Sequence, residues 1–404
     1  MFRWRQPHVG DLGNGEPEPD DAGQPRSEPE ERSGHIAVFC GTRMYVWGGY
    51  LADNSVDLYL PSSEMWIYDT ETQVWHRREL GGELPPPMSG SCAVCVDGRL
   101  YMFGGHHHRG NSNEFYTMDL CPRGDSYKWE RISNYTGQPP SPKDKLGCWT
   151  HGNKLVFFGG YGYQPREAHR GTFEFDETSL WGPNVSRGWN NHVHIFDLET
   201  YSWSQPLTTG TPPLPRAAHA CATHGNRGYL FGGRYLGARM NDLHYLNLDN
   251  WAWSGPIAVR GEVPLGRSWH TLTAASDDQL FLYGGFTTER QPLGDGWIYS
   301  VKSQEWRKLS HIPPDRPRLW HTATLSEEGE VLVFGGCSNN LLAGEMSGHK
   351  NDVLVFCIQP KSLLRLSVDA VARHRELLCT QWGALPRHLS SRLLQRTGGP
   401  ASGS

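Results

Sequence analysis

The sequence predicts an all-β protein, a six-bladed β-propeller with a C-terminal helical extension. Three features lead to this prediction: a double glycine that recurs along the chain, a short motif that opens each repeat, and a tryptophan near the end of most repeats. A recurring unit of about 50 residues with several short strands is typical of a propeller blade. Because one blade cannot bury its apolar faces alone, we expect the repeats to close into a single ring.

The double glycine sets the number of repeats. Its copies are separated by 56, 55, 73, 52 and 51 residues, and they begin at Gly48, Gly104, Gly159, Gly232, Gly284 and Gly335. Six copies indicate six blades. The stretch 215–253 shows the unit most clearly, with an apolar run on each side of Gly225, a third run of alternating apolar residues and a short fourth strand at Trp253.

Two other features recur in register with the double glycine. The opening motif, which is Arg-x-x-His in its fullest form, lies at 32–35, 88–91, 145–148, 216–219, 267–270 and 318–321. The tryptophan recurs at Trp75, Trp129, Trp203, Trp253 and Trp306. Because three separated features repeat together, the unit resembles the kelch repeat, whose copies form the blades of a β-propeller.

The propeller is expected to occupy residues 31–359. The segment 1–30 is rich in Pro, Gly, Glu and Asp, and it is predicted to be a disordered acidic arm. Blade three carries an insertion between 161 and 191. Blade six lacks the closing tryptophan, so either the arm supplies its outer strand or this blade has three strands. The apolar period then becomes helical, which predicts a helical segment over 360–396 and a flexible tail over 397–404.

The composition argues against several classes of function. A formal net charge of -5 disfavours nucleic acid or an anionic membrane as a partner, and no apolar run reaches the ~18 residues of a membrane span. Nine scattered cysteines fit reduced thiols in a soluble intracellular protein. Motifs of zinc proteases, serine hydrolases and phosphate-binding loops are missing, so we expect a binding protein rather than an enzyme, with no metal or cofactor.

Residues from all six blades are expected to meet at one rim. The first two strands of a blade are antiparallel neighbours, so each opening motif lies beside the residue that follows the double glycine. This rim gathers cations, aromatic rings and a hydroxyl, namely Lys145, Arg187, Arg234, Arg239, Trp189, Trp269, Trp320 and Ser268. Arginine can bind both oxygens of a carboxylate, and tryptophan can bury apolar chain beside it. The sequence therefore predicts a site for an anionic chain terminus.

Two sets of repeat-equivalent residues are expected to be structural. The opening arginines, Arg32, Arg216, Arg267 and Arg318, are interpreted as bridges between neighbouring blades. The opening histidines, His35, His219, His270 and His321, also fit a ring of metal ligands. We favour a structural role for these histidines, because residues that follow a repeat usually satisfy local backbone groups.

Residues 31–404 resemble the kelch-repeat substrate receptors of cullin-2 ubiquitin ligases. The resemblance is carried by segments that include ERSGH, MSGSC, KDKLG, FFGGYGY, RGWNNHVHI, ARMNDLHYLNLD, GRSWH and PRLWH. In that family the propeller mouth captures protein C-termini that end in Gly-Gly, which act as degradation signals. The resemblance implies carboxylate binding by Arg234, Arg239 and Ser268 and a peptide contact from Lys145. The implied pocket walls are Tyr50, Tyr161, Arg187, Trp189, Trp269 and Trp320.

The helical segment resembles the elongin-binding box of the same family. Leu363, Ser367 and Val371 match the box, and Leu385 with Pro386 looks like the cullin-selecting element. The resemblance implies a non-catalytic adaptor that acts with elongin B-C, cullin-2 and its RING subunit in the nucleus and cytoplasm, and that targets substrates for ubiquitination and proteasomal degradation. A kelch scaffold for cytoskeletal or signalling partners is the alternative, and a propeller oxidase or hydrolase is a third.

The chain ends in Gly403 and Ser404, a glycine followed by a terminal carboxylate. This end is close to the ligand inferred for the mouth. A short flexible tether gives an effective concentration of about millimolar order, so even a weak ligand on it competes well. Two outcomes stay open: self-association through Gly403 and Ser404, or an unbound end.

Overall fold

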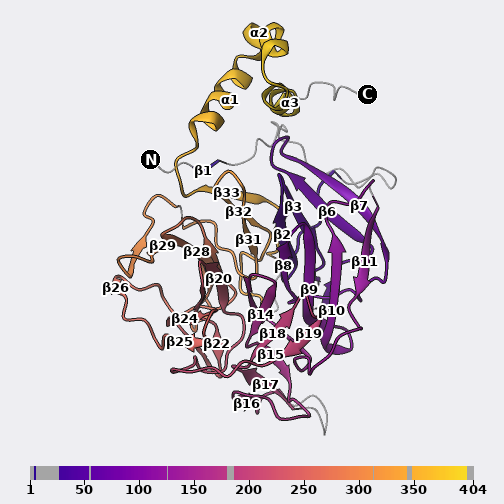
Figure 1. The fold of residues 1–404 in the computed structure, drawn as a ribbon. Coiled ribbons are helices and arrows are strands. Elements are labelled where there is room, and N and C mark those ends of the chain that lie inside the picture. The colour runs from indigo at the N-terminus through magenta and orange to yellow at the C-terminus, as the bar shows by residue number, and fades with distance from the viewer. Residues whose placement is uncertain are drawn as a thin grey trace.

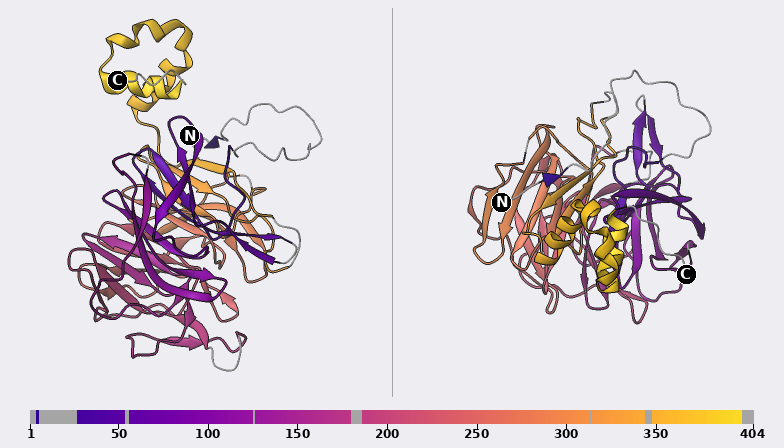
Figure 2. Two further views of the ribbon diagram at one scale, coloured as in Figure 1. Left: turned by 90° about the vertical axis from the view of Figure 1, so that its right-hand side faces the viewer. Right: turned by 90° about the horizontal axis from the view of Figure 1, so that it is seen from above.

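The structure is a computed structural model that describes residues 4–5, 27–53, 56–124, 126–179, 186–312, 314–343 and 348–397. Strands form blades around a central axis, and a group of helices lies at one end of the molecule, as Figure 1 and Figure 2 show. The predicted all-β, six-bladed propeller with a C-terminal helical extension is confirmed.

Each blade contains four strands in which neighbours are antiparallel. Blade one comprises β2 (Ile36–Cys40), β3 (Arg43–Trp47), β6 (Glu64–Asp69) and β7 (Val74–Gly82), and blade two comprises β8 (Cys92–Val96), β9 (Arg99–His107), β10 (Gly110–Asp119) and β11 (Tyr127–Arg131). Blade three comprises β13 (Gly147–His151), β14 (Lys154–Phe158), β18 (Val193–Asp197) and β19 (Ser202–Ser204), and blade four comprises β20 (Ala220–His224), β21 (Arg227–Phe231), β24 (Leu243–Asn247) and β25 (Ala252–Trp253). Blade five comprises β27 (Thr271–Ala274), β28 (Gln279–Phe286), β29 (Pro292–Ser300) and β30 (Glu305–Lys308), and blade six comprises β31 (Thr322–Leu325), β32 (Glu330–Phe334), β33 (Val353–Cys357) and β1 (Trp4–Arg5). The connections add β4 (Tyr50–Asp53), β5 (Val56–Tyr59), β12 (Lys143–Asp144), β15 (Tyr161–Tyr163), β16 (Phe173–Phe175), β17 (Arg187–Asn190), β22 (Arg234–Tyr235), β23 (Ala238–Arg239) and β26 (Arg260–Gly261).

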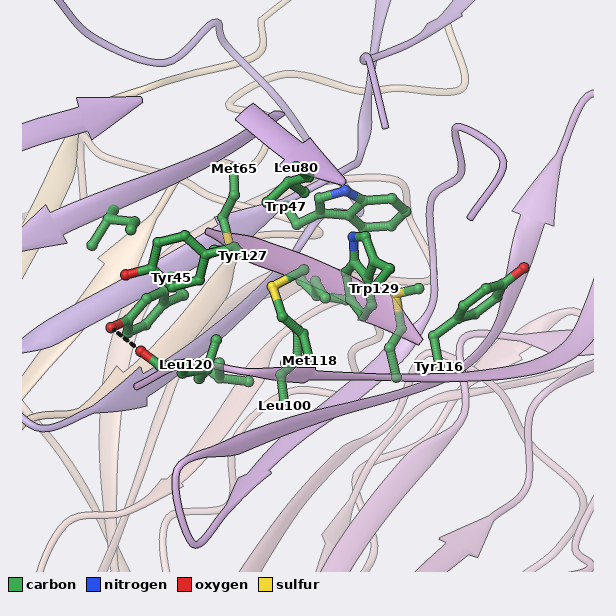
Figure 3. Close-up of a cluster of buried hydrophobic side chains, with 14 of the residues drawn as sticks. Tyr45, Trp47, Met65, Leu80, Leu100, Tyr116, Met118, Leu120, Tyr127 and Trp129 are labelled. Carbon is green, nitrogen blue, oxygen red and sulfur yellow. Dashed lines mark hydrogen bonds between the residues drawn. The ribbon is translucent and has the colours of Figure 1, made fainter. Parts of the chain in front are cut away.

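Apolar side chains fill the space between neighbouring blades. Between blades one and two, the rings of Trp47 and Trp129 meet edge-on with their centroids 5.4 Å apart (Figure 3). The hydroxyl of Tyr45 donates to the backbone oxygen of Leu120 at 3.0 Å, which satisfies a polar group inside this cluster. Strand β7 also pairs in parallel with β11, so these two blades share one eight-stranded sheet.

The innermost strands close the ring, because β2, β8, β13, β20, β27 and β31 each contact the next and β31 contacts β2. They surround a channel with a cavity of about 240 Å³. A closed circle of backbone hydrogen bonds crosses one end of this channel, with N···O distances of 2.7 to 2.9 Å. We call it the backbone ring, and its members are Gly34, Gly90, Lys145, Ala218, Trp269 and Trp320. Each member donates to the one in the preceding blade, and all have a positive φ of 54° to 69°.

The opening arginines are structural, but their side chains act within a blade. Arg216 binds Asp242 of its own blade through two hydrogen bonds of 2.7 and 2.8 Å. Arg267 pairs with Asp295 and Arg318 with Asp352 in their own blades. The expected side-chain bridge between blades is therefore wrong for these three arginines. The backbone makes the link instead, since the carbonyl of Arg216 accepts from the N–H of Gly160 in blade three.

The opening histidines pack against the preceding blade. His35 of blade one meets Phe334 of blade six edge-on, with ring centroids 5.2 Å apart, and so helps to close the propeller. The equivalent contacts are His219 with Phe158, His270 with Phe231, and His321 with Tyr283. Burial lowers the pKa of His321 to about 3, so its ring is neutral at physiological pH.

Blade six takes its outer strand from the other end of the chain. In β1, Trp4 lies opposite Phe356 and Arg5 opposite Val355 of β33. This pairing decides between the two alternatives that the absent tryptophan left open. These two residues differ from the disordered arm expected at 1–30, and residues 6–26 lie outside the described part of the chain.

The helical extension consists of α1 (Leu363–Arg373), α2 (Arg375–Leu378), a 3-10 helix (Cys379–Ala384) and α3 (Arg387–Arg396). Ser362 caps α1, because its side chain accepts from the N–H of Arg365. Val368, Trp382 and Leu393 form the small core of the extension.

A group of ion pairs joins the helices to the propeller. Arg365 of α1 contacts Glu71 at 3.2 Å and Glu328 at 3.1 Å, both in turns of the propeller. Arg396 of α3 contacts the other oxygen of Glu71 at 2.7 Å and also pairs with Asp369. We call these five residues the charged junction. It lies at the end of the propeller opposite to β16, β17 and β22 (Figure 1).

Candidate functional site

The structure brings the openings and the residues after the double glycines together at one rim, which we call the mouth. The second opening residue of each blade pairs with the post-glycine residue: Ser33 with Tyr50, Ser89 with His106, Asp144 with Tyr161, Ala217 with Arg234, Ser268 with Phe286, and Leu319 with Cys337. In blade three this pairing puts Lys143 at the first opening position. The expected opening at 145–148 is therefore wrong by two residues, and Lys145 belongs to the backbone ring.

Two tryptophans form the floor of the mouth. The rings of Trp269 and Trp320 are stacked with their centroids 5.2 Å apart, and both residues belong to the backbone ring. The ring of Trp320 reaches across to blades one and two, whose members of the backbone ring are Gly34 and Gly90. A Cβ added at Gly34 would lie 2.9 Å from Cε2 of Trp320. The absence of a side chain at Gly34 therefore leaves room for the ring of Trp320.

The insertion of blade three supplies one wall. Strands β15 and β17 pair antiparallel, and the rings of Tyr161 and Trp189 lie with their centroids 5.3 Å apart. The guanidinium of Arg187 is 5.3 Å from the centroid of the Tyr161 ring, and Nζ of Lys145 is 5.8 Å from it. Lys145 also pairs with the buried carboxylate of Asp144, so its charge is locally balanced. This wall is aromatic, with cations held against its rings.

The adjoining wall, from blade four, carries two arginines. Strands β22 and β23 form a short hairpin in which Arg234 and Arg239 are direct cross-strand partners. Nε of Arg239 donates to Oγ of Ser268 at 2.8 Å, and Nε of Arg234 donates to the backbone oxygen of Leu236 at 2.9 Å. Among the described residues, neither arginine forms an ion pair with a carboxylate. Like charges directly opposite in a hairpin repel, so an anion bound between them is favoured.

The electrostatics of this wall are those of an anion site. Burial, together with the nearby charges of Arg234 and Arg290, lowers the pKa of Arg239 to about 10, while Glu289 acts in the opposite sense. The contributions of Arg234 and Arg290 show that like charges gather near Arg239, which favours a bound anion. Arg290, in an exposed turn after β28, is a member of this group that the sequence reasoning missed.

Blade one completes the mouth through Tyr50. Its ring is 5.3 Å from that of Trp320 and 5.3 Å from that of His349, measured between centroids. His349 in turn contacts Oγ of Ser33 through Nδ1 at 2.7 Å. The sequence reasoning missed His349, because it lies in a connection that matches no repeat motif.

All ten residues predicted for the mouth meet there. They connect through the ring, cation and hairpin contacts given above, together with Arg234 over Trp189 at 5.6 Å, Arg239 over Phe286 at 4.7 Å, and Trp269 beside Phe286 at 5.9 Å. Sequence reasoning did not single out Asp144 or Tyr235, which also contact this set. The only indication of a role for Asp144 and Tyr235 in the sequence is that each is next to a residue predicted for the mouth.

The residues predicted for the elongin and cullin surface divide into two groups. Leu363 is 83% exposed, and Ser367 and Pro386 are also exposed. Val371 and Leu385 instead pack against the helical core. Among the described residues of the extension, Leu363 is the most exposed large apolar side chain, and Leu364, Leu366 and Leu377 are also exposed.

Over the resolved ranges from 27 to 397, no group of three or more His, Cys, Asp or Glu residues is arranged to hold a metal ion. In the same part of the chain, no helix is long and apolar enough to cross a membrane.

The closed ring and the double-glycine register define a kelch-repeat β-propeller, and the chain belongs to this family. The model of the KLHDC2/KLHL20/DRC7 Kelch-repeats domain matches residues 34–254, 165–336 and 255–376. The chain is 56% identical over 373 residues to Kelch domain-containing protein 2 of Bos taurus, covering 92% of this chain and 91% of that protein. It is 50% identical over 368 residues to Kelch domain-containing protein 1 of Mus musculus, covering 91% and 90%. The solved structure of YjhT shares the fold, with a TM-score of 0.58 and 16% identity over 81% of this chain and 95% of that one.

Proposed function

We propose that this protein is a non-catalytic substrate receptor of a ubiquitin ligase. Its mouth binds proteins whose C-terminus is Gly-Gly, and its helical extension docks elongin B-C, cullin-2 and the RING subunit. Substrates held in this way are ubiquitinated and degraded by the proteasome. The receptor works in the nucleus and the cytoplasm, with no cofactor and with no nucleic acid or membrane as a partner.

The pair of arginines in the β22–β23 hairpin is the observation that carries this proposal. Arg234 and Arg239 face each other at the edge of an aromatic floor, and Ser268 is already hydrogen-bonded to Arg239. A terminal carboxylate has two oxygens for these donors and removes the repulsion between the guanidinium groups. An internal peptide segment has no such charge, so the site favours a chain end.

The preference for glycine follows from the aromatic surfaces around the arginines. Trp269, Trp320 and Trp189 surround the space next to the carboxylate site with flat rings. The backbone of glycine can lie against such rings without a side chain between them. Terminal Ala and Val are therefore expected to bind progressively more weakly.

The helical extension supports the ligase part of the proposal through its exposed leucines. Leu363, Leu364 and Leu366 are exposed in the first turns of α1, while Val368 packs with Leu393 of α3 in the core of the extension. Apolar side chains left in solvent on one helix suggest a partner surface.

The experiment compares two peptides of one sequence that ends in Gly-Gly, one with a free acid and one with a C-terminal amide. A charge-assisted hydrogen bond contributes about 1.5 to 3 kcal/mol, so the acid should bind at least about tenfold more tightly in calorimetry. Equal affinities would contradict the proposal. Tight binding of an internal segment, with no preference for a free acid, would instead favour a kelch scaffold for cytoskeletal or signalling partners.

A further inference from the structure

Blade three departs from the ion-pair pattern of blades four to six. In blade four, Arg216 at the first opening position binds Asp242 at the start of the third strand. His192 occupies the position in blade three that Asp242 occupies in blade four. In each of these blades, the N–H of the first glycine of the double glycine donates to the carbonyl of this residue. Lys143 and His192 therefore replace an arginine and an aspartate. Blade three therefore has two basic groups where blade four has a cation paired with an anion.

Two more histidines surround this pair. Nδ1 of His169 lies 2.9 Å from Nε2 of His194, and the ring of His169 stacks on that of His192 with centroids 5.4 Å apart. The side chains of Lys143, His192 and His194 are almost completely buried. Within the described ranges, Lys143 forms no ion pair, and its Nζ donates to Oδ1 of Asn190 at 3.2 Å. We call Lys143, His169, His192 and His194 the basic cluster.

The basic cluster lies directly behind the wall of the mouth. Lys143 is in β12, where its backbone pairs with Gly162, the residue after Tyr161 in β15. Its hydrogen-bond acceptor Asn190 ends β17 and follows Trp189. The amide of Asn190 also donates to the backbone oxygen of Gly160 at 3.0 Å. Lys143 therefore touches both strands that carry the aromatic wall, β15 through its backbone and β17 through its side chain.

We propose that Lys143 is a positioning residue for the peptide site: without its extra proton it holds the β15–β17 wall through Asn190, and protonation inside the basic cluster loosens this wall and weakens binding of a C-terminal peptide. The identity of the ligand rests on the proposed function. The coupling between the basic cluster and the wall rests on the contacts described above.

The energetics favour a neutral lysine at this position. Burial lowers the pKa of Lys143 from 10.5 to about 7, and burial also lowers the pKa of His192 to about 3. The unfolded chain holds the lysine proton up to about pH 10.5, whereas the folded chain releases it above about pH 7. The folded wall therefore gains stability as pH rises through this window, and it is least favoured below about pH 7.

Other titratable groups lie on the elements that surround Lys143. They are His169 and Glu167 in the insertion, His194 on β18, His106 and His107 on β9, and Glu114 on β10. Burial lowers the pKa of His169, His194, His106 and His107 below the ordinary histidine value. Lys143 is the group in this set that is both completely buried and poised near neutrality.

The test is the affinity of a fluorescent Gly-Gly peptide between pH 8 and pH 6. We expect binding to the wild type to be about fivefold weaker at pH 6, within the tenfold per pH unit that one linked proton allows. The double variant Lys143→Arg with His192→Asp restores the pair found in blade four and should bind with no change over this range. Lys143→Met, which cannot take up a proton, should also show no change. His106→Gln alters a histidine of the mouth and should keep the wild-type pH dependence.

A flat profile for the wild type, or an unchanged slope in both Lys143 variants, would overturn the proposal. Hydrogen exchange provides a readout that needs no peptide. In the wild type, the amides of 161–163 and 187–190 should lose protection at pH 6 relative to pH 8 by several-fold, after correction for intrinsic rates, while those of β24 in blade four should not. If no peptide binds at any pH but the exchange behaves in this way, the proposed ligand is wrong and the coupling stands. Equal protection of the wall at both pH values would show that Lys143 does not position it.

Discussion

Arginines lie at both ends of the propeller, in opposite electrostatic surroundings. At the charged junction, Arg365 and Arg396 share the carboxylate of Glu71 through contacts of 3.2 and 2.7 Å. At the mouth, Arg234 and Arg239 face each other across a hairpin without an acidic partner among the described residues. The first pair fastens two parts of the protein together. The second pair leaves donors available for an anion that the described residues do not provide.

The comparison separates two uses of one side chain. A buried arginine whose donors are all matched contributes to the folded state, and removing it leaves a buried acid unpaired. An arginine that faces another arginine reduces stability slightly, and the repulsion disappears when an anion binds. The same residue type is therefore structural or functional according to its partner, which a sequence alone does not display.

The largest expected effect is the loss of one interaction, at the helical end of the molecule, with no change in binding at the mouth. Replacing Leu363 by Asp places a charge in the exposed leucine surface of α1 and should abolish co-purification of elongin B-C, with affinity for a Gly-Gly peptide unchanged. Leu207→Asp, at a leucine of the propeller that is 74% exposed, is the matched control and should keep elongin B-C. If Leu363→Asp lowers peptide affinity as well, the two ends are not independent.

The second effect concerns a paired arginine. Arg216→Met leaves the carboxylate of Asp242 without its arginine, with only the contact to His244 remaining, and we expect the free energy of unfolding to fall by about 3 kcal/mol in urea denaturation. Arg239→Met provides the comparison, since it removes a charge from a repulsive pair and should change stability by less than about 1 kcal/mol. Similar losses in the two variants would remove the distinction between paired and unpaired arginines.

The third effect concerns the unpaired arginine as a ligand contact. Arg239→Met should weaken binding of a free-acid Gly-Gly peptide by about tenfold to a hundredfold, because it removes a charge-assisted hydrogen bond. The amidated peptide should bind the variant and the wild type alike. Calorimetry with both peptides measures this difference, and an equal loss for acid and amide would place the carboxylate elsewhere.

The smallest effect tests whether the chain supplies its own anion. Residues 398–404 lie outside the described part of the chain, and α3 ends at the rim opposite the mouth (Figure 1). We propose that the tail occupies the mouth of a second copy through Gly403 and Ser404. Deleting these two residues should shift sedimentation toward the monomer and raise the apparent affinity for a Gly-Gly peptide by about twofold to fivefold. An unchanged sedimentation profile over a wide concentration range would argue for an unbound end.

Much of the fold could be predicted because six copies of the repeat define the same strand register. The double glycine and the opening motif placed the post-glycine residues on one rim, and the structure pairs Arg234 with Ala217 and Tyr50 with Ser33 as this register requires. Blade three was misaligned because Lys143 and Asp144 do not match the opening pattern of the other blades. The neighbouring Lys145 was taken for the first position instead.

The remainder depends on contacts between distant segments. Strand β1 has two residues, and nothing in its local sequence indicates that β33 is its partner. The basic cluster draws His169 from an insertion and Lys143 from the opening, so no local pattern unites them. In the helical extension, periodicity predicted an apolar stripe, but the tertiary packing that partly buries Val371 and leaves Leu363 exposed is set by α3 and Trp382.

The backbone ring closes the mouth at its inner end. Each of its six N–H groups already donates to a neighbouring carbonyl, and the indole of Trp320 lies across Gly34 and Gly90 above it. A polypeptide therefore cannot thread through the propeller axis, and a loop can enter only by folding back on itself. Under the proposed function, this obstruction favours the ends of polypeptides as ligands, because only the last residues of a chain can reach the floor with no further chain to accommodate.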